Sequence, residues 1–258
     1  MPPVSVPPIE ELVAPPAWRT LEFISDLHLH ASEPAKFEAW RRYMAETRAD
    51  AVFILGDLFE VWVGDDAASE PGFDADCAGV LQAASRLRPV FFMHGNRDFL
   101  VGEGLMQASG VTLLDDPTVL DFAGQRWLLT HGDQLCLEDT DYLKFRAEVR
   151  DPKWRQTMLA HPLVERRAMA KSLRERSAAR HAAAKEVYGE VDEAAAAAWL
   201  EAADARTMIH GHTHRPREHA LPGGRERIVL ADWDEARDGS PGELLRLDAS
   251  GARRVPIS

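Results

Sequence analysis

Short apolar runs recur along the chain, with segments of helical periodicity between them. Five runs have the length of a β-strand and lack strict alternation of apolar and polar positions, the pattern of strands buried on both faces. The predicted strands cover residues 21–24, 51–55, 89–93, 127–129 and 207–209. The sequence therefore predicts a sheet structure that is covered on both sides.

Helical periodicity fills the gaps between the first strands. Apolar residues recur at helical spacing over 36–47, and 76–87 has a similar pattern. Strand, helix and strand in repeated order indicate layered α/β architecture. Residues 115–127 instead have the pattern of a hairpin, so we expect a mixed sheet.

The two remaining parts of the chain differ from the rest in amino-acid composition. Residues 151–205 are rich in alanine, arginine and glutamate and lack strand signals, which predicts an inserted set of helices. The proline-rich residues 1–18 lack the features of a signal peptide and are expected to be a flexible extension. The main domain is thus expected over residues 19–258, with a helical cap inserted at about 151–205.

Composition narrows the class of protein. A chain of 258 residues can form one sizeable α/β domain, and the net charge of −12 argues against binding nucleic acid through phosphate neutralisation. The two cysteines, Cys77 and Cys136, are too few for a disulfide framework or a cysteine-based zinc site, which fits a reducing, cytoplasmic setting. No apolar run has the roughly 18 or more residues of a membrane span.

Each predicted strand is followed by residues of the types that commonly bind metal ions. In an open α/β sheet, ligands bind beyond the carboxyl ends of the strands, so we expect these groups to converge. Asp26 and His28 are two residues apart, as are His212 and His214, and an extended backbone would point both members of each pair the same way. The candidate metal ligands are Asp26, His28, Asp57, Asn96, His131, His212 and His214.

This ligand set suits particular ions. Oxygen and imidazole ligands without thiolate favour manganese, iron or zinc. Seven candidates are too many for one tetrahedral site, but they fit two ions that share one carboxylate and lie roughly 3.5 to 4 Å apart. Such pairs of ions support in-line displacement at phosphorus.

The motifs, in their order, resemble those of the calcineurin-like metallophosphoesterases. They are Asp26-Leu27-His28, Gly56-Asp57, Gly95-Asn96, His131-Gly132-Asp133 and Gly211-His212-Thr213-His214. The resemblance implies two facing mixed sheets flanked by helices. It also implies two metal subsites that share Asp57: Asp26, His28 and His214 complete the first, and Asn96, His131 and His212 complete the second.

A narrower resemblance is to the members of this family that cleave the pyrophosphate of UDP-2,3-diacylglucosamine in lipid A biosynthesis. It rests on "FISDLHL", "GDLFEVWVGDD", "MHGNRDFL", "THGDQLCLEDTDYLKFR" and "MIHGHTHRP". It implies hydrolysis to UMP and 2,3-diacylglucosamine 1-phosphate by a hydroxide activated by two Mn²⁺ ions. It further implies a monomer that binds a UDP-linked lipid at the cytoplasmic face of the inner membrane.

The same resemblance assigns roles to residues. It implies that Asn96, Arg97 and His212 are catalytic, and that these three together with Asp139 and Ser177 bind substrate. Arg97 stands where the wider family commonly has histidine, and its permanent charge favours phosphate binding over proton transfer. The resemblance also implies that the cap receives the acyl chains. The chain departs from the family pattern in the cap, where it has His181 and Ala184 in place of asparagine and lysine.

Several alternatives stay open at the level of the sequence. His94 can be structural or functional, and Asp65 and Asp66 can form a turn or cap a helix. We expect Asp98 and Asp133 to orient metal ligands without binding the metal. The arginines of the cap, Arg166, Arg167 and Arg174, are candidates for contact with anionic lipid. The rival functions are a hydrolase of nucleotide or dinucleotide polyphosphates, a non-catalytic scaffold and a lipid carrier.

Overall fold

The strands are arranged in two sheets that face each other. The computed structural model describes residues 5–184, 189–233 and 242–257, with side chains throughout except at 174–184. Within these residues, sheet A has the order β1 (Glu10–Val13), β6 (Thr118–Phe122), β7 (Gln125–Leu129), β8 (Thr207–His210), β10 (Arg225–Val229) and β9 (Glu218–Leu221). Sheet B has the order β12 (Gly251–Pro256), β11 (Glu243–Asp248), β2 (Thr20–Ile24), β3 (Ala51–Leu55), β4 (Val90–Met93) and β5 (Thr112–Leu114).

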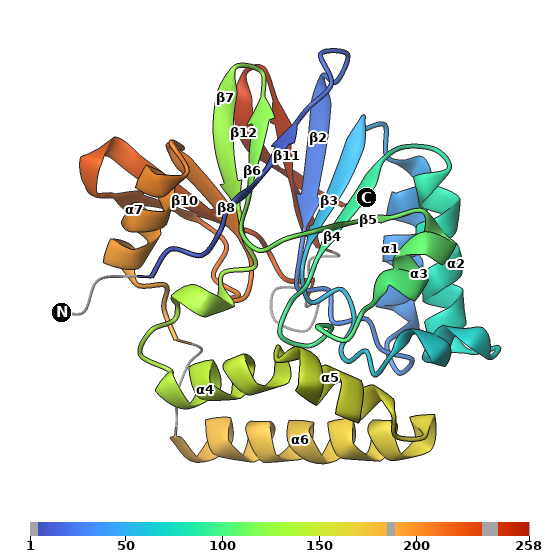
Figure 1. Ribbon diagram of the computed structural model, residues 1–258. Coiled ribbons are helices and arrows are strands. Elements are labelled where there is room, and N and C mark those ends of the chain that lie inside the picture. The colour runs from blue at the N-terminus through green and yellow to red at the C-terminus, as the bar shows by residue number, and fades with distance from the viewer. Residues whose placement is uncertain (1–4, 185–188, 234–241, 258) are drawn as a thin grey trace.

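Both sheets are mixed, as the sequence predicts. Strands β2, β3, β4 and β5 are parallel, and so are β7, β8 and β10. Strands β6 and β7 form the expected antiparallel hairpin, and β11 runs antiparallel to β2. The carboxyl ends of the parallel strands therefore lie at the same end of both sheets (Figure 1).

Strands in the middle of sheet B are apolar because both faces of the sheet are buried there. In β3, Phe53 packs between the two sheets, while Val52 and Ile54 point into the core that separates sheet B from the helices. Those helices are α1 (Pro34–Glu46), α2 (Phe73–Ser85) and α3 (Glu103–Ser109), and α7 (Glu193–Ala202) covers sheet A on the opposite flank (Figure 1). The resulting order of layers is helices, sheet, sheet, helix.

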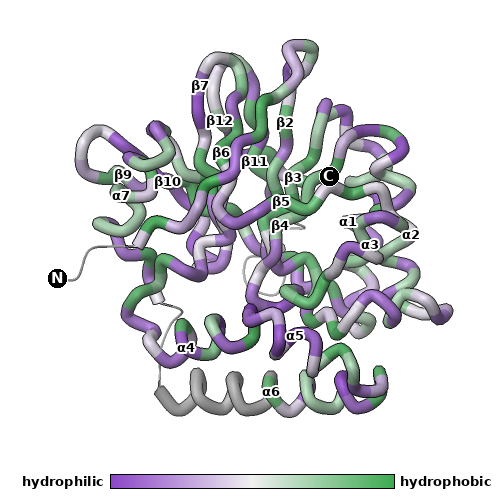
Figure 2. Tube along the Cα trace, in the orientation of Figure 1, coloured by the Kyte–Doolittle hydropathy of each residue, from purple (hydrophilic) through white to green (hydrophobic). Residues whose placement is uncertain are grey.

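A separate layer of helices lies across one end of the sandwich. It consists of α4 (Thr140–Val149), α5 (Pro152–Leu159) and α6 (Leu163–Ala184), below the strands in Figure 1. Figure 2 shows that polar residues recur along α4, α5 and the coloured part of α6. The expected cap boundaries of 151–205 are therefore shifted: the layer already begins with α4, and α7 belongs to the sandwich because Trp199 and Leu200 are buried against sheet A.

Part of the N-terminal segment forms a strand. Residues 10–13 form β1, which pairs in parallel with β6 at the edge of sheet A, and the Nε1 atom of Trp199 donates a hydrogen bond to Ser5 O at 3.1 Å. The expectation of a flexible extension over 1–18 is wrong for the strand, because an edge position tolerates neighbouring prolines. Among the described residues, no helix is long and apolar enough to cross a membrane.

Candidate metal centre

The sandwich brings all seven candidate ligands to one place at the ends of the strands. Asp26 and His28 follow β2, Asp57 follows β3, and Asn96 follows β4 of sheet B. Residues from sheet A complete the set: His131 follows β7, and His212 and His214 follow β8. The centre therefore takes its groups from both sheets.

The first group of candidate ligands consists of Asp26, His28 and His214. The Nε2 atoms of His28 and His214 lie 3.3 Å apart, and His214 Nε2 lies 3.3 Å from Asp26 Oδ1. Asp57 Oδ2 lies 3.9 Å from His28 Nε2. Two imidazole nitrogens and the Asp26 carboxylate thus face a common point, and Asp57 lies beside His28.

The second group is built around His131. Its Nε2 atom lies 3.9 Å from Asp57 Oδ2 and 3.1 Å from Asn96 Oδ1. The same Asn96 oxygen lies 2.9 Å from His212 Nδ1. Asp57 is therefore within 4 Å of a histidine from each group, as expected of a carboxylate shared by two ions.

The backbone at these ligands is left-handed, contrary to the expectation of extended geometry. The φ angle is 54° at Asp26 and 49° at His28, and it is 67° at His212 and 52° at His214. Asp57 also has a positive φ, of 52°. Non-glycine residues rarely adopt this conformation, and such residues cluster at functional sites where the surrounding structure holds them in place.

Glycines make room for the carboxylates. A Cβ atom at Gly95 would lie 2.0 Å from Asp57 Oδ1, and one at Gly211 would lie 2.4 Å from Asp26 Oδ2. Each of these glycines precedes a candidate ligand, namely Asn96 or His212. Glycine is required here because the loops approach each other too closely for any side chain.

The electrostatics of the centre favour a cation. Burial alone would lower the pKa of His214, but hydrogen bonds with Asp232 and Asp26, together with their negative charges, raise it to about 11. Burial also opposes the charge of His131, yet Asp57, Asp26 and Asp133 raise its pKa to about 9. Carboxylates that hold buried imidazoles in the charged form create a negative potential that suits divalent metal ions, whose binding releases such protons. The donor set thus fits a two-metal centre.

A family comparison agrees with this geometry. The model of the family described as calcineurin-like phosphoesterase matches residues 21–216, which contain every candidate ligand. The chain belongs to the calcineurin-like phosphoesterase family. The fold of two mixed sheets flanked by helices is the one expected from the resemblance.

This chain aligns over nearly its whole length with similar members of the phosphoesterase family. It is 45% identical to the UDP-2,3-diacylglucosamine hydrolase of Xanthomonas axonopodis pv. citri, over 90% of this chain and 97% of that protein. It is 44% identical to proteins of the same name from Stenotrophomonas maltophilia strain K279a and from Chromobacterium violaceum. The first alignment covers 90% of this chain and 96% of the relative, and the second 92% and 98%.

In this phosphoesterase, a carboxylate lies beside the Nδ1 atom of each of two histidines. His214 Nδ1 lies 3.1 Å from Asp232 Oδ2, and His28 Nδ1 lies 3.3 Å from Glu60 Oε2. The sequence analysis missed both carboxylates. Asp232 had a signal, because it follows the apolar residues 228–231 at the end of β10 in the same way as the ligands follow other strands.

Asp98 and Asp133, which the sequence analysis expects to orient ligands, contact residues that neighbour the candidate ligands. Asp98 accepts hydrogen bonds from the backbone N of Leu58 and of Gly95, both at 2.8 Å, and so joins two of the phosphoesterase's ligand loops. Asp133 accepts hydrogen bonds from the hydroxyl of Tyr142 and from Arg146 Nε. Tyr142 also stacks on the ring of His212 at 5.9 Å between centroids, a contact that sequence reasoning missed.

The residues whose roles the sequence analysis did not decide have partners in the structure. The Nε2 atom of His94 lies 2.7 Å from Val101 O, and burial lowers the pKa of His94 to about 4, so it is a structural histidine. Asp65 accepts hydrogen bonds from the backbone of Gly102 and Leu105 at the start of α3. Asp66 forms an ion pair with Arg166.

The other expected substrate residues lie around the centre or beyond it. Arg97 lies next to Asn96, and its backbone N donates to Asp57 Oδ1 at 2.8 Å. Asp139 is the N-cap of α4, where its Oδ1 accepts a hydrogen bond from Tyr142 N. Ser177 lies within α6, and its side chain is outside the described residues, as are those of His181 and Ala184.

Proposed function

We propose that the protein hydrolyses the pyrophosphate bond of UDP-2,3-diacylglucosamine and releases UMP and 2,3-diacylglucosamine 1-phosphate, a step of lipid A biosynthesis. The main support is the joint presence of the seven-residue centre and Arg97 in a chain that is 45% identical, over 97% of the relative, to a protein named for this substrate. A scaffold or a lipid carrier would not need this set of ligands.

Two divalent metal ions complete the centre in this proposal, and Mn²⁺ suits its mixture of oxygen and imidazole donors. Asp26, His28 and His214 would hold one ion, and Asn96, His131 and His212 the other, with Asp57 shared. When bound, such ions activate water and neutralise phosphoryl oxygens.

The chain's own residues then bind and orient the pyrophosphate. Arg97 presents a permanently charged planar fork to the phosphoryl oxygens, where it stabilises the charge that develops as water adds to phosphorus and the bridging P–O bond breaks. The Asn96 carboxamide and the His212 ring, whose Oδ1 and Nδ1 atoms lie 2.9 Å apart, orient the reacting group. Analogy with the family places the attack on the phosphorus nearer uridine. The oxygen of water is then found in UMP, and 2,3-diacylglucosamine 1-phosphate is the leaving group.

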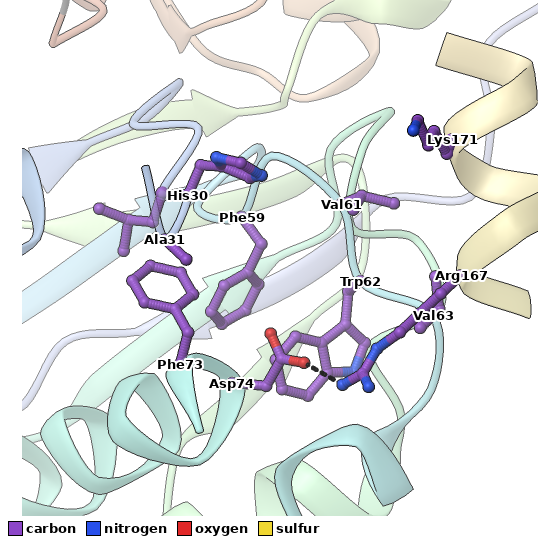
Figure 3. A pocket seen from close by; sticks show the side chains of 11 residues that line it. His30, Ala31, Phe59, Val61, Trp62, Val63, Phe73, Asp74, Arg167 and Lys171 are labelled. Atoms are coloured by element: carbon purple, nitrogen blue, oxygen red, sulfur yellow. Dashed lines mark hydrogen bonds and ion pairs between the residues drawn. The ribbon is translucent and has the colours of Figure 1, made fainter. Parts of the chain in front are cut away.

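An apolar pocket beside the centre is the proposed compartment for an acyl chain. It has a volume of about 290 Å³ and lies between the loop that follows Asp57, the start of α2, and α6 (Figure 3). Phe59, Trp62 and Phe73 form its aromatic wall, and the ion pair of Arg167 with Asp74 crosses its edge. The cap residues Met158 and Leu163 are at least partly buried, whereas Leu159, Val164 and Met169 are exposed.

The exposed apolar residues of the cap also suit peripheral association with the cytoplasmic face of the inner membrane. Val164 is 74% exposed, and Arg167 on the same helix can attract anionic lipid at about 1 kcal/mol per charge. Arg166 cannot contribute as the sequence analysis expected, because its side chain is buried. The side chain of Arg174 is outside the described residues. We further propose that the protein acts as a monomer without nucleic acid.

Phosphorus NMR of the reaction tests this function. Chelator-treated protein with added Mn²⁺ should release UMP from UDP-2,3-diacylglucosamine, while protein without metal and the His131→Ala variant should not. A dinucleotide polyphosphate serves as the competing substrate. Turnover of the dinucleotide alone would replace the lipid assignment with the nucleotide alternative, and loss of all turnover would favour the scaffold.

A further inference from the structure

Glu60 occupies a fixed position between two loops of the centre. It lies three residues after Asp57, and its backbone N donates a hydrogen bond to Leu29 O at 3.1 Å. His28 N donates to Asp57 O at 3.0 Å, and Leu29 and Phe59 form an isolated parallel bridge. The two loops thus run side by side beyond β2 and β3, which places Glu60 next to His28 by backbone contacts alone.

The carboxylate of Glu60 meets two functional side chains. Its Oε2 atom lies 3.3 Å from His28 Nδ1, and its Oε1 atom lies 3.9 Å from Arg97 Nη1. The three side chains are only 16%, 17% and 24% exposed for Glu60, His28 and Arg97. Water therefore screens these charges less than it would at an open surface.

The contact with His28 determines which ring nitrogen is available to a metal ion. His28 Nε2 faces Asp26, Asp57 and His214, so Nδ1 is the outer nitrogen. A carboxylate beside Nδ1 favours the tautomer with its proton on that atom, which leaves the lone pair of Nε2 for the cation.

The contact with Arg97 restrains the guanidinium. At 3.9 Å the two groups form an ion pair, whose attraction favours a position of the guanidinium beside Glu60. The guanidinium has five N–H donors, and its fork binds phosphate best when its plane is fixed in advance. A single carboxylate therefore influences the metal ligand and the phosphate-binding group together.

We propose that Glu60 is a positioning residue that links His28 to Arg97 and thereby couples metal binding to phosphate binding. The part that concerns Arg97 rests on the proposed function. The part that concerns His28 depends only on the metal centre. An experiment with two arms separates them.

The first arm measures metal binding without substrate. Mn²⁺ is titrated calorimetrically into chelator-treated wild type, Glu60→Gln and Glu60→Asp. Glu60→Gln keeps the shape but loses the charge, so its Mn²⁺ affinity should fall about 10- to 100-fold, the usual effect of losing an outer carboxylate. Glu60→Asp keeps the charge and should recover part of the affinity. Glu70→Gln removes an exposed carboxylate of the same loop region and should bind Mn²⁺ like the wild type.

The second arm measures coupling, with UMP as the phosphate probe and saturating Mn²⁺. UMP affinity is compared in wild type, Glu60→Gln, Arg97→Lys and the double variant. If Glu60 acts through Arg97, the loss in the double variant should be smaller than the product of the two single losses. Losses that multiply would overturn the coupling.

The two arms fail in different ways. Unchanged Mn²⁺ affinity in Glu60→Gln would refute the role of Glu60 at His28, whatever the substrate is. If wild-type protein does not bind UMP, the coupling and the proposed function both fail while the metal arm still stands. Urea unfolding of the metal-free variants checks that they fold. If Glu60 had only a structural role, Glu60→Gln would lower the free energy of unfolding but would leave the Mn²⁺ affinity of the folded protein unchanged.

Discussion

His214 Nδ1 lies 3.1 Å from Oδ2 of Asp232, while Nε2 of the same ring lies 3.3 Å from Asp26 Oδ1. The imidazole is thus held between a carboxylate outside the centre and one within it. Asp232 follows β10, which lies beside β8 in sheet A, so the parallel pairing of these strands brings the two residues together.

Asp232→Asn should weaken metal binding about 10- to 100-fold, because the amide restrains the ring less firmly and lowers its basicity. Calorimetric titration of Mn²⁺ into chelator-treated protein measures the effect. Asp115→Asn is the matched control, since Asp115 is exposed in a loop of sheet B. Equal affinities for wild type and Asp232→Asn would show that Asp232 does not support the ligand.

Gly95→Ala should disrupt the centre. The added Cβ would lie 2.0 Å from Asp57 Oδ1 and 2.3 Å from Asp57 N, so the loops must separate. We expect a loss of roughly 1–3 kcal/mol in the free energy of unfolding, together with weaker metal binding. Gly79→Ala is the control: its Cβ would meet nothing within 4 Å in the interior of α2, and the variant should gain roughly 0.5–1 kcal/mol. Urea unfolding of both variants decides, and a neutral Gly95→Ala would contradict the close approach.

Arg166→Ala should loosen the contact of α6 with the rest of the protein. The Arg166 side chain is 3% exposed and donates to Val63 O, to Asp66 and, at 2.9 Å, to His161 O. Its removal leaves the buried carbonyl of Val63 without this donor, which should cost roughly 1–3 kcal/mol.

The neighbouring residue provides the control for this substitution. Arg167 is 51% exposed and pairs with Asp74, so Arg167→Ala should change stability by less than about 1 kcal/mol. Hydrogen exchange of α6 and urea unfolding compare the two variants. Equal effects would mean that burial of Arg166 does not stabilise the layer.

Glu190 should make stability depend on pH in the acid range. Burial alone would raise the pKa of Glu190, but hydrogen bonds from Arg215 and Arg227 lower it below the ordinary 4.5. A carboxyl whose pKa is lowered on folding stabilises the protein above its unfolded pKa and loses this contribution as the pH falls through its folded pKa. The wild type should therefore exceed Glu190→Gln in unfolding free energy at pH 7, and the difference should shrink below pH 4.5.

Urea unfolding at several pH values, with chelator present, measures this difference. Glu70→Gln is again the control, because Glu70 is exposed and should give a difference from wild type that does not change with pH. A gap between wild type and Glu190→Gln that stays constant or widens in acid would show that the ion pairs of Glu190 do not stabilise the fold.

The five predicted strands and the candidate ligands were predictable from the sequence because one cause produces both patterns, whereas other strands, such as β1, β5 and β9, were not predicted. A strand such as β3 is apolar at every position since Phe53 packs between the sheets and Ile54 packs under the helices. A polar residue directly after such a run, such as Asp57, must then lie at the end of the sheet. The same logic extends to Asp232, which the sequence analysis overlooked.

Other features were not predictable because they depend on tertiary contacts. The left-handed backbone at Asp26 and His28 is imposed by neighbouring loops, whereas local spacing favours an extended chain. Arg166 has the sequence context of an exposed helical face, yet it is buried where α6 meets the loop that follows β3. Glu60 likewise carries no local signal, since its partners come from two other strands.

The ligand set also has a mechanical consequence for the sandwich. Asp26, His28 and Asp57 come from sheet B, and His131 and His214 come from sheet A, so an ion bound by both sets would cross-link the sheets. Any substitution that widens the packed layer around Phe53 would also move the ligand loops apart, although Phe53 is not itself a candidate ligand. The distance between the sheets therefore limits the geometry of the metal centre. Thermal stability should rise with metal concentration, because only the folded protein brings the ligands of the two sheets together to bind the ions.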